Sequence, residues 1–410
     1  MSSVTLSRIG RILLVIFLEG IAVLLALYQG LSGVYTDEAK YLLNIPYPHP
    51  PLARSLFHAM EFLPQQELLV RIVLATLLIQ AVWLVGSLAR NLSIEKRVTL
   101  CGFWLFSGAV LFQAGTIMMA PLTALQGLLF VWLYFREENV SLGWIALMWL
   151  ASLFTAYQAI LYLPIVFVLI WRSPESFLKK VIAFCIPLLL VVLYVLTNPL
   201  AIASFTSAGG QNAALSLGTI AKQAFSSWLF AGSAVFSVVG TVAVFRSKKR
   251  ELIGSFLLVA LFLCVSFRAY YSILFLPLFV AGVIAHSETL KRESLFLALH
   301  ILAAVYIFSV ASLQFYENTA RTVMRTVNQS SQEGVVLIAG GFGHQWQYES
   351  TSPIFRYRPA LLSKAKAVVC LEECPGIDRY AFYQVSNLAQ EVWIRQHIPY
   401  TTPQTSVRHR

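Results

Sequence analysis

The stretch VTLCGFWLFSGAVLFQAGTIMMAPLTALQGLLFVWLYF, residues 98–135, runs for 38 residues without a charged side chain. A helix needs about 20 apolar residues to cross a bilayer, so this stretch is long enough for two crossings joined by a turn. Similar stretches recur along most of the 410-residue chain, in which 58% of residues are hydrophobic, 12% are charged and the mean hydropathy is +0.71. The composition therefore predicts a multi-span membrane protein and argues against a secreted soluble enzyme or a soluble dehydrogenase.

The apolar stretches predict eleven membrane-spanning helices, and hence an all-α polytopic domain. They lie near 12–30, 67–88, 98–113, 119–135, 141–155, 157–171, 179–197, 223–245, 251–267, 270–286 and 294–315. We interpret 141–171 as two short spans. A single span there would put the basic run RSKKR (246–250) on the opposite side of the membrane from the other basic loops.

The net charge of +11 does not indicate a nucleic-acid partner, because the basic residues lie in short loops between apolar stretches. With eleven spans, the loops on the amino-terminal side hold fifteen Lys and Arg residues, and the opposite short loops hold only Lys40, Arg54, Lys222 and Arg268. Cytoplasmic loops are enriched in Lys and Arg. We therefore expect a multi-pass protein of the inner (plasma) membrane with a cytoplasmic N-terminus and an outer-facing tail.

We divide the chain into a transmembrane domain, 1–315, which includes an outer loop at 31–66, and an extracytoplasmic domain, 316–410. The tail predicts a small α/β domain, with a helix-like stretch at 315–327, a β-rich run at 335–340, another apolar run at 367–369 and a last helix around 384–396. Cys370 and Cys374 are the only cysteines outside the apolar stretches. A local disulfide between them would require an oxidising compartment.

The first outer loop reads VYTDEAKYLLNIPYPHPPLARSLFHAM over residues 34–60. It contains Asp37, one of only two aspartates in the chain, next to Glu38 at the point where the first span leaves the bilayer. A carboxylate pair at the membrane surface can act as a general base, or can bind a hydroxylic substrate or a metal. The alternative is that the two charges only mark a helix end on the water side.

Several segments of the chain resemble GT-C glycosyltransferases, most closely the group of protein O-mannosyltransferases and aminoarabinose transferases. TDEAKY (36–41), HPPLARSLF (49–57) and LLVRIVLATLLIQAVWL (68–84) resemble the start of that family, in which an Asp–Glu pair opens the first outer loop. TAYQAILYLP (155–164) and FRAYYSILFLPLFVAG (267–282) resemble two later family segments. The predicted spans and the outer C-terminal domain also fit this architecture.

Two positions depart from the family pattern. Leu122 lies near the place where the family usually carries a second acidic residue, and Ala156 stands where members often have lysine. Both positions bear on metal binding and on donor contacts. The departures point to a different acceptor or to an inactive relative.

The resemblance implies that a polyprenyl-phosphate donor gives its sugar, on the outer face, to a lipid-linked glycan, a lipid or a protein hydroxyl. We expect a single inverting displacement in which Asp37, with Glu38 as the second candidate, accepts the proton of the acceptor hydroxyl. The leaving phosphate needs cationic or hydrogen-bonding partners. The candidates for this role are Arg268, Tyr270, Tyr271, His49, Arg54 and Lys222. The alternatives are that Arg268 anchors the chain at the membrane interface within an aromatic belt, and that His49 only stabilises the Pro-rich turn. A divalent cation stays open as a cofactor, because one Asp–Glu pair supplies too few ligands to require it.

Two other functions compete with this interpretation: a lipid or polysaccharide transporter or flippase, and a non-catalytic relative of the enzyme. A transporter is expected to show pseudo-symmetric halves and ionisable residues near the membrane midplane. The sequence shows no such halves, and its most informative polar residues lie at the outer edge. The carboxylate of Glu19 is an exception inside the first span, and we expect it to pair with Arg71 on the second span.

Overall fold

The computed structural model describes residues 8–46, 48–136, 140–203, 216–266, 269–290, 292–312, 318–386 and 388–396. Its contacts divide the chain into two compact units. The first unit comprises Met1–Ser32 and Lys40–Phe315, and the second comprises Gly33–Ala39 and Tyr316–Arg410. The segment Gly33–Ala39, from the first outer loop, thus belongs to the same unit as the C-terminal tail.

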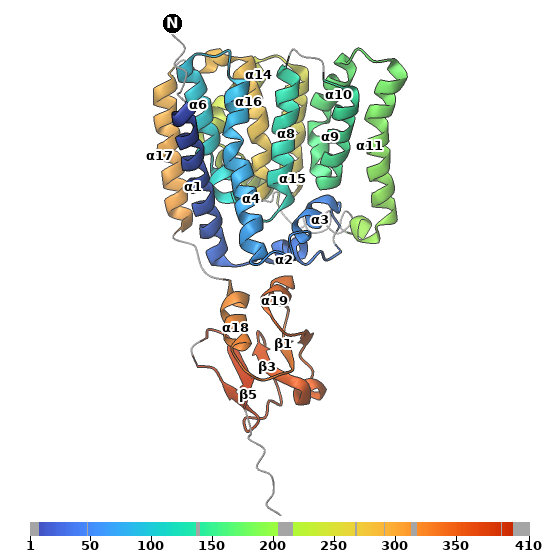
Figure 1. Cartoon of the computed structure of the whole chain (residues 1–410), viewed down its shortest axis with the longest axis vertical. Helices are drawn as coiled ribbons and strands as arrows, with labels where there is room; N and C mark the ends of the chain where they lie inside the picture. Colours follow the sequence, from blue (N-terminus) through green and yellow to red (C-terminus); the bar gives the residue numbers. More distant parts are fainter. Residues whose placement is uncertain are drawn as a thin grey trace, which may run out of the picture. The chain divides into compact units, whose positions relative to one another are not determined.

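The first unit is a bundle of apolar helices that run side by side, with α3 across one end (Figure 1). Helix α1 packs along α4, and α14 packs along α16. The elements are α1 (Arg8–Ser32), α2 (Thr36–Leu42), α3 (Leu52–His58), α4 (Gln66–Gln80), α5 (Val82–Leu88), α6 (Ile94–Leu105), α7 (Gly108–Gln113), α8 (Met119–Phe135), α9 (Leu142–Thr155), η1 (Tyr157–Tyr162), α10 (Leu163–Arg172), α11 (Phe177–Thr197), α13 (Leu217–Ala231), α14 (Val235–Arg246), α15 (Arg250–Ser266), η2 (Ala269–Phe275), α16 (Leu276–Ala285), η3 (Ser287–Thr289) and α17 (Glu293–Ser312). Helix α2 continues across the boundary between the two units.

Among the described residues, four helices are long and apolar enough to cross a membrane: α1, the continuous α4–α5, α11 and α17. The bent pair α13–α14 makes a fifth if it is counted as one span, and shorter apolar helices lie at 119–135, 142–155, 157–172 and 270–285. Large apolar side chains face outward, with Leu24, Leu196 and Leu302 exposed by 67%, 64% and 65%. Such a surface suits hydrocarbon better than water, so the predicted helical membrane fold is confirmed.

The sequence predicted one span over 223–245, but this stretch is not one straight helix. Helices α13 and α14 meet at an angle of 97°. Ser233 and Ala234 at the break have φ values of +47° and +60°, which end the helical path. The Ser237 hydroxyl accepts a hydrogen bond of 2.9 Å from the Gly232 N–H and so satisfies a donor that the break would otherwise leave buried. Hydrophobicity alone carries no signal for this bend, because both arms are apolar.

The expected pair between Glu19 and Arg71 is also wrong. Arg71, which is 1% exposed, pairs instead with Glu67, and its Nε lies 2.9 Å from a Glu67 carboxylate oxygen. Glu67 precedes Arg71 by one turn of α4, so the partner is local. The Glu19 carboxylate accepts hydrogen bonds from Thr76 Oγ1 at 2.5 Å and from Gln80 Nε2 at 3.3 Å. A hydroxyl and an amide thus satisfy this carboxylate inside the bundle.

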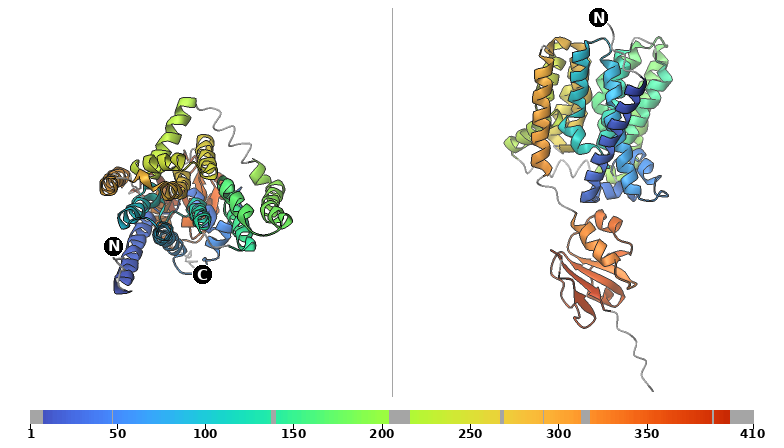
Figure 2. Two further views of the ribbon diagram at one scale, coloured as in Figure 1. Left: turned by 90° about the horizontal axis from the view of Figure 1, so that it is seen from above. Right: turned by 60° about the vertical axis from the view of Figure 1, so that its left-hand side comes forward.

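The second unit is an α/β domain whose described strands form one five-stranded sheet with the order β2-β1-β3-β5-β4 (Figure 2). Its elements are α18 (Thr319–Asn328), β1 (Val335–Ala339), α19 (His344–Glu349), β2 (Ile354–Arg356), η4 (Pro359–Lys364), β3 (Ala365–Cys370), β4 (Phe382–Gln384) and β5 (Glu391–Arg395). Strands β2, β1 and β3 are parallel, and β5 and β4 are antiparallel to their neighbours. Apolar residues of α18 and α19 pack on one sheet face in a common core.

The predicted strand regions at 335–340 and 367–369 are confirmed as β1 and β3. The last helix expected around 384–396 is wrong, because that region forms β4 and β5. Residues EVWIR alternate across β5: Val392 and Ile394 join the core beneath α18, and Trp393 joins the core on the opposite sheet face. An alternation of period two with β-branched and aromatic residues favours a strand.

Cys370 and Cys374 form a disulfide at the end of β3. Each cysteine is packed at the sheet face that carries Trp393 and Phe382. Disulfides persist in oxidising compartments, so this bond agrees with the expected extracytoplasmic location of the tail.

Candidate functional site

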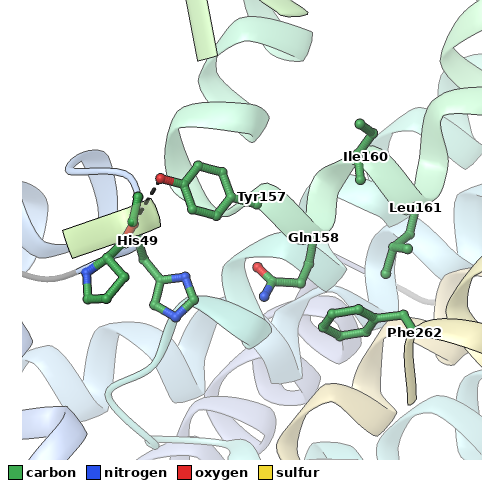
Figure 3. A pocket seen from close by; sticks show the side chains of 8 residues that line it. His49, Tyr157, Gln158, Ile160, Leu161 and Phe262 are labelled. Carbon is green, nitrogen blue, oxygen red and sulfur yellow. Dashed lines mark hydrogen bonds between the residues drawn. The ribbon is translucent and has the colours of Figure 1, made fainter. Parts of the chain in front are cut away.

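The first unit contains a cavity of about 230 Å³ between the Pro-rich loop, η1 and α15 (Figure 3). We call it the Gln158 cavity. It is lined by Pro48, His49, Tyr157, Gln158, Ile160, Leu161, Ala201 and Phe262. One end of the lining is polar and the rest is apolar. Such a lining suits an amphipathic ligand, because a few polar groups can orient it while apolar contacts hold the remainder.

The polar end of the cavity is assembled from two distant segments. The Tyr157 hydroxyl donates a hydrogen bond of 2.8 Å to the Pro48 carbonyl, and its ring centroid lies 6.0 Å from that of His49. Proline is restricted in φ, so the loop around His49 is stiff, and Tyr157 ties it to η1. The interaction therefore fixes the His49 side chain at the cavity wall.

Gln158 is the most informative residue of this lining. Its side chain is 8% exposed, and its Nε2 donates a hydrogen bond of 2.9 Å to the Tyr271 hydroxyl. Its Oε1 is buried and has no hydrogen-bond partner among the described residues. An unsatisfied buried acceptor costs about 1–3 kcal/mol, so a ligand that donates a hydrogen bond there gains affinity.

A smaller basic pocket adjoins the cavity through His49. It is lined by Lys40, Tyr41, His49, Pro50 and Arg54. Arg54 donates a hydrogen bond of 3.1 Å to the Ile45 carbonyl through Nη1, whereas its buried Nε has no hydrogen-bond partner among the described residues. No lining residue of this pocket is acidic. Lysine, arginine and histidine converge here on a space with no room for a water molecule, so an anion such as a phosphate binds only if these side chains move apart.

The two predicted carboxylates differ in their surroundings on α2. Glu38 is 3% exposed, and its side chain accepts a hydrogen bond of 3.0 Å from the Tyr35 N–H. This contact, from the third helical residue back to the N-cap, satisfies a donor at the helix start. Asp37 is half-buried in the first turn of the same helix. Glu38 therefore stabilises the start of the helix, and Asp37 is the more exposed of the two carboxylates.

The other predicted phosphate-binding residues are dispersed. Tyr271 is 3% exposed, and its ring centroid lies 4.4 Å from that of Tyr270. Tyr271 thus supports the wall behind Gln158. Lys222 is exposed on α13 and lines neither the Gln158 cavity nor the basic pocket. Arg268 lies outside the described residues.

The structure adds site residues that the sequence analysis did not select. Lys40 and Gln158 belong to segments that it quoted, TDEAKY and TAYQ, but only the three-dimensional arrangement shows that they line pockets shared with His49.

A metal site would need several ligands close together. The described residues contain no group of three or more His, Cys, Asp or Glu side chains that could hold an ion.

The sequence matches no protein-family model and no curated protein. Solved structures of ArnT from Cupriavidus metallidurans are similar to the chain. The structure bound to undecaprenyl phosphate has a TM-score of 0.62 and 11% sequence identity, and the match covers 94% of this chain and 98% of that one. The apo structure has a TM-score of 0.45 and 11% identity, with 94% and 97% covered. The chain therefore has the fold of ArnT, a GT-C glycosyltransferase, over nearly its whole length.

Proposed function

We propose that this chain is a membrane glycosyltransferase that takes a sugar from a polyprenyl-phosphate donor. The observation that carries the proposal is the pair of adjoining pockets in the first unit: a basic one around Lys40, His49 and Arg54, and a half-apolar cavity with Gln158 at its polar end. A lipid-linked sugar phosphate combines an anion, hydroxyl groups and a hydrocarbon chain. Each of these parts has a matching chemistry in the two pockets.

The basic pocket is the proposed binding site of the donor phosphate. Lys40 and Arg54 supply positive charge there, and His49 lies between this pocket and the Gln158 cavity. Cationic donors fixed in place before the reaction stabilise the charge that develops on a leaving phosphate. Tyr270 and Tyr271 support the cavity wall in this scheme. Arg268 and Lys222 remain proposed phosphate contacts on the sequence resemblance alone.

Asp37 is the proposed general base. Asp37 is not among the lining residues of the two pockets, and its assignment rests on the resemblance of TDEAKY to the Asp–Glu pair of the family and on its place in the first turn of α2. The Asp37 carboxylate accepts the proton of the acceptor hydroxyl while the hydroxyl oxygen bonds to the anomeric carbon. The bond from that carbon to the phosphate oxygen breaks, and the polyprenyl phosphate leaves with the electron pair, which inverts the anomeric configuration.

The fold and the location support the same function. ArnT, whose fold the chain shares, has been solved with undecaprenyl phosphate bound. We propose that the reaction takes place on the outer membrane face. The positive-inside pattern supports this orientation, and the Cys370–Cys374 disulfide is compatible with it. The acceptor in this proposal is a lipid-linked glycan, a lipid or a protein hydroxyl.

Replacement of Asp37 tests the proposal. The full chain is expressed in bacterial membranes, which supply acceptors, and is given a panel of radiolabelled undecaprenyl-phosphate pentoses and hexoses. Loss of a general base slows transfer by about 10²–10⁴-fold, so Asp37→Asn should reduce labelled product by that factor. Asp378→Asn is the matched control, because Asp378 is the other aspartate of the chain and is exposed in the tail. It should stay within about twofold of wild type, because it removes no group of the proposed site.

The same experiment separates the competing functions. Wild-type activity in Asp37→Asn would refute the assignment of the base. A wild-type chain that moves the labelled lipid across the membrane without forming product would instead be a transporter. A chain that binds undecaprenyl phosphate but gives neither product nor transport would be a non-catalytic relative.

A further inference from the structure

We infer that the C-terminal unit holds the Asp37 segment, Gly33–Ala39, in place for the reaction, and that Asn318, Arg321 and Gln345 are positioning residues. The inference rests on the proposed function for its consequence in catalysis. The restraint of the Asp37 segment by the tail is argued from contacts within the second unit. The segment belongs to that unit although it lies about 280 residues before the tail in the chain.

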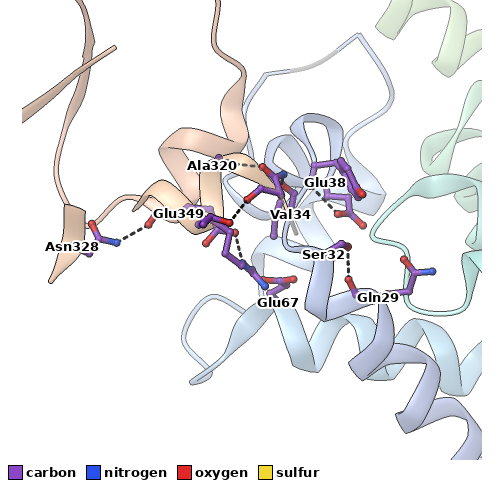
Figure 4. Close-up of polar contacts among 12 residues, drawn as sticks. Gln29, Ser32, Val34, Glu38, Glu67, Ala320, Asn328 and Glu349 are labelled. Carbon is purple, nitrogen blue, oxygen red and sulfur yellow. Dashed lines mark hydrogen bonds and ion pairs between the residues drawn. The ribbon is translucent and has the colours of Figure 1, made fainter. Parts of the chain in front are cut away.

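The first contact joins Asn318 to the backbone just before Asp37 (Figure 4). The Asn318 Nδ2 donates a hydrogen bond of 2.7 Å to the Val34 carbonyl, and its Oδ1 accepts one of 2.9 Å from the Ala320 N–H. Asn318 is 8% exposed, and Val34 is fully buried. One side chain therefore caps helix α18 and also holds the Asp37 segment. A buried bond of this kind is costly to break.

The second contact is a close approach at Gly33. Its φ is +84°, and a Cβ added there would lie 2.9 Å from the Arg321 Nε and 3.2 Å from the Arg321 Cδ. Arg321 cannot move aside freely, because its Nε is paired with the Glu349 carboxylate at 2.8 Å. Only glycine combines this backbone conformation with so close a neighbour. The start of the segment is thus packed against an ion pair between α18 and α19.

The third contact lies next to Asp37 itself. The Thr36 hydroxyl is hydrogen-bonded to the Gln345 side chain on α19. Thr36 is the first residue of α2 and Asp37 is the second. The tail therefore holds the residue that directly precedes the proposed base. Together with the contacts at Gly33 and Val34, this restrains three of the four residues before Asp37.

The contacts have a direct consequence for catalysis. A misplacement of about 1 Å in a reacting group can cost about 10²-fold in rate, so a short helix at a loop needs outside support to keep its carboxylate aligned. Helix α2 has only seven residues, too few to be stable alone. The C-terminal unit supplies that support through side chains that do not themselves react. The effect should therefore be larger on kcat than on binding of the donor.

The test compares the same Asn→Asp substitution at the two ends of α18, in the full chain. Asn318→Asp keeps the shape and the helix cap but removes the donor to Val34. Asn328→Asp is the matched control: it removes a bond of 2.8 Å from its Nδ2 to the Glu349 backbone carbonyl, whereas the pair between the Glu349 carboxylate and Arg321 keeps both of its partners. Thr36→Val removes the bond to Gln345 without loss of volume, and Thr36→Ser restores a hydroxyl. The readouts are kcat, the Kd for undecaprenyl phosphate, and backbone hydrogen exchange over 33–39.

Asn318→Asp and Thr36→Val should each lower kcat by about 10- to 100-fold. The Kd for undecaprenyl phosphate should change by a smaller factor than kcat, because neither Asn318 nor Thr36 lines a pocket of the first unit. Exchange over 33–39 should rise in both variants, whereas Thr36→Ser and Asn328→Asp should behave as wild type. Unchanged kcat and exchange in Asn318→Asp and Thr36→Val would overturn the inference. An equal loss in Asn328→Asp would also overturn it, because it would mean general destabilisation of the unit.

The experiment gives a different result if the proposed function is wrong. If the wild-type chain transfers no sugar, the exchange readout still decides whether the tail holds the Asp37 segment. Faster exchange in Asn318→Asp and Thr36→Val alone supports the holding. Wild-type exchange in both variants refutes it.

Discussion

At the scale of single residues, the side-chain amide of Gln158 is hydrogen-bonded through its nitrogen but not through its oxygen among the described residues. Its Nε2 is bound to Tyr271, while its Oε1 is buried beside His49 without a partner among the described residues. Retaining such a group lowers the free energy of unfolding, and an apolar residue of similar size would avoid this cost. A buried acceptor at the wall of a cavity is therefore expected to serve a ligand hydroxyl or ammonium group.

Replacement of Gln158 by leucine should separate stability from activity. We expect Gln158→Leu to change the thermal midpoint little, because removal of the unsatisfied Oε1 offsets the lost bond to Tyr271, and to raise the donor KM about tenfold, since one hydrogen bond to the ligand is lost. Gln126→Leu is the control, because Gln126 also has a buried Oε1 without a partner in the described part of the chain but lies outside the cavity. Midpoints and KM of both variants are measured in nanodiscs. An unchanged KM in Gln158→Leu would remove Gln158 from the substrate site.

At the scale of elements, local pattern predicted the existence of helices and strands better than their bends and ends. The predicted apolar stretches fall on apolar helices, of which four, or five with the bent pair α13–α14, are long enough to cross a membrane in the described part of the chain. The bend between α13 and α14 depends on the Gly232 N–H meeting the Ser237 hydroxyl, which a hydropathy pattern does not record. The strands β4 and β5 are short, so their alternation was too brief to outweigh a helical interpretation.

The bend predicts a sharp response to substitution at Gly232. A Cβ there would lie 2.5 Å from the Ser237 backbone nitrogen, so Gly232→Ala must displace the start of α14. We expect a destabilisation of about 1–3 kcal/mol, seen as a lower thermal midpoint in detergent. Gly218→Ala, in the first turn of α13 with only Ser216 Oγ at 3.9 Å, should be neutral or slightly stabilising. Equal midpoints for the two variants would mean that the bend is not tightly packed.

At the scale of the whole molecule, the proposed orientation in the membrane rests on the charge pattern and is compatible with the disulfide. The Cys370–Cys374 bond lies in the C-terminal unit, and the three other cysteines belong to helices of the first unit. A disulfide and the positive-inside pattern have independent physical causes, since one reports redox potential and the other insertion energetics. An outer location of the tail is the orientation that we propose on these two grounds.

Thiol labelling of intact spheroplasts checks this orientation. A membrane-impermeant maleimide should label Cys370 and Cys374 only after reduction, and labelling should not require the membrane to be opened. The variant Cys370→Ser/Cys374→Ser should give no label in intact spheroplasts. Labelling of Cys370 and Cys374 that appears only after the membrane is opened would place the tail in the cytoplasm and refute the predicted orientation.

The sequence by itself determined the class of the protein: an apolar helical bundle, basic loops on one side, and a polar α/β tail. These properties depend on how each residue partitions between water and hydrocarbon, and that preference is local. Only the tertiary structure decided which distant segments meet. Asn318 holds Val34 across 284 positions, and Gln158 meets Tyr271 across 113. Such pairs arise from packing and hydrogen-bond geometry among elements, so no window along the chain contains the information that selects them.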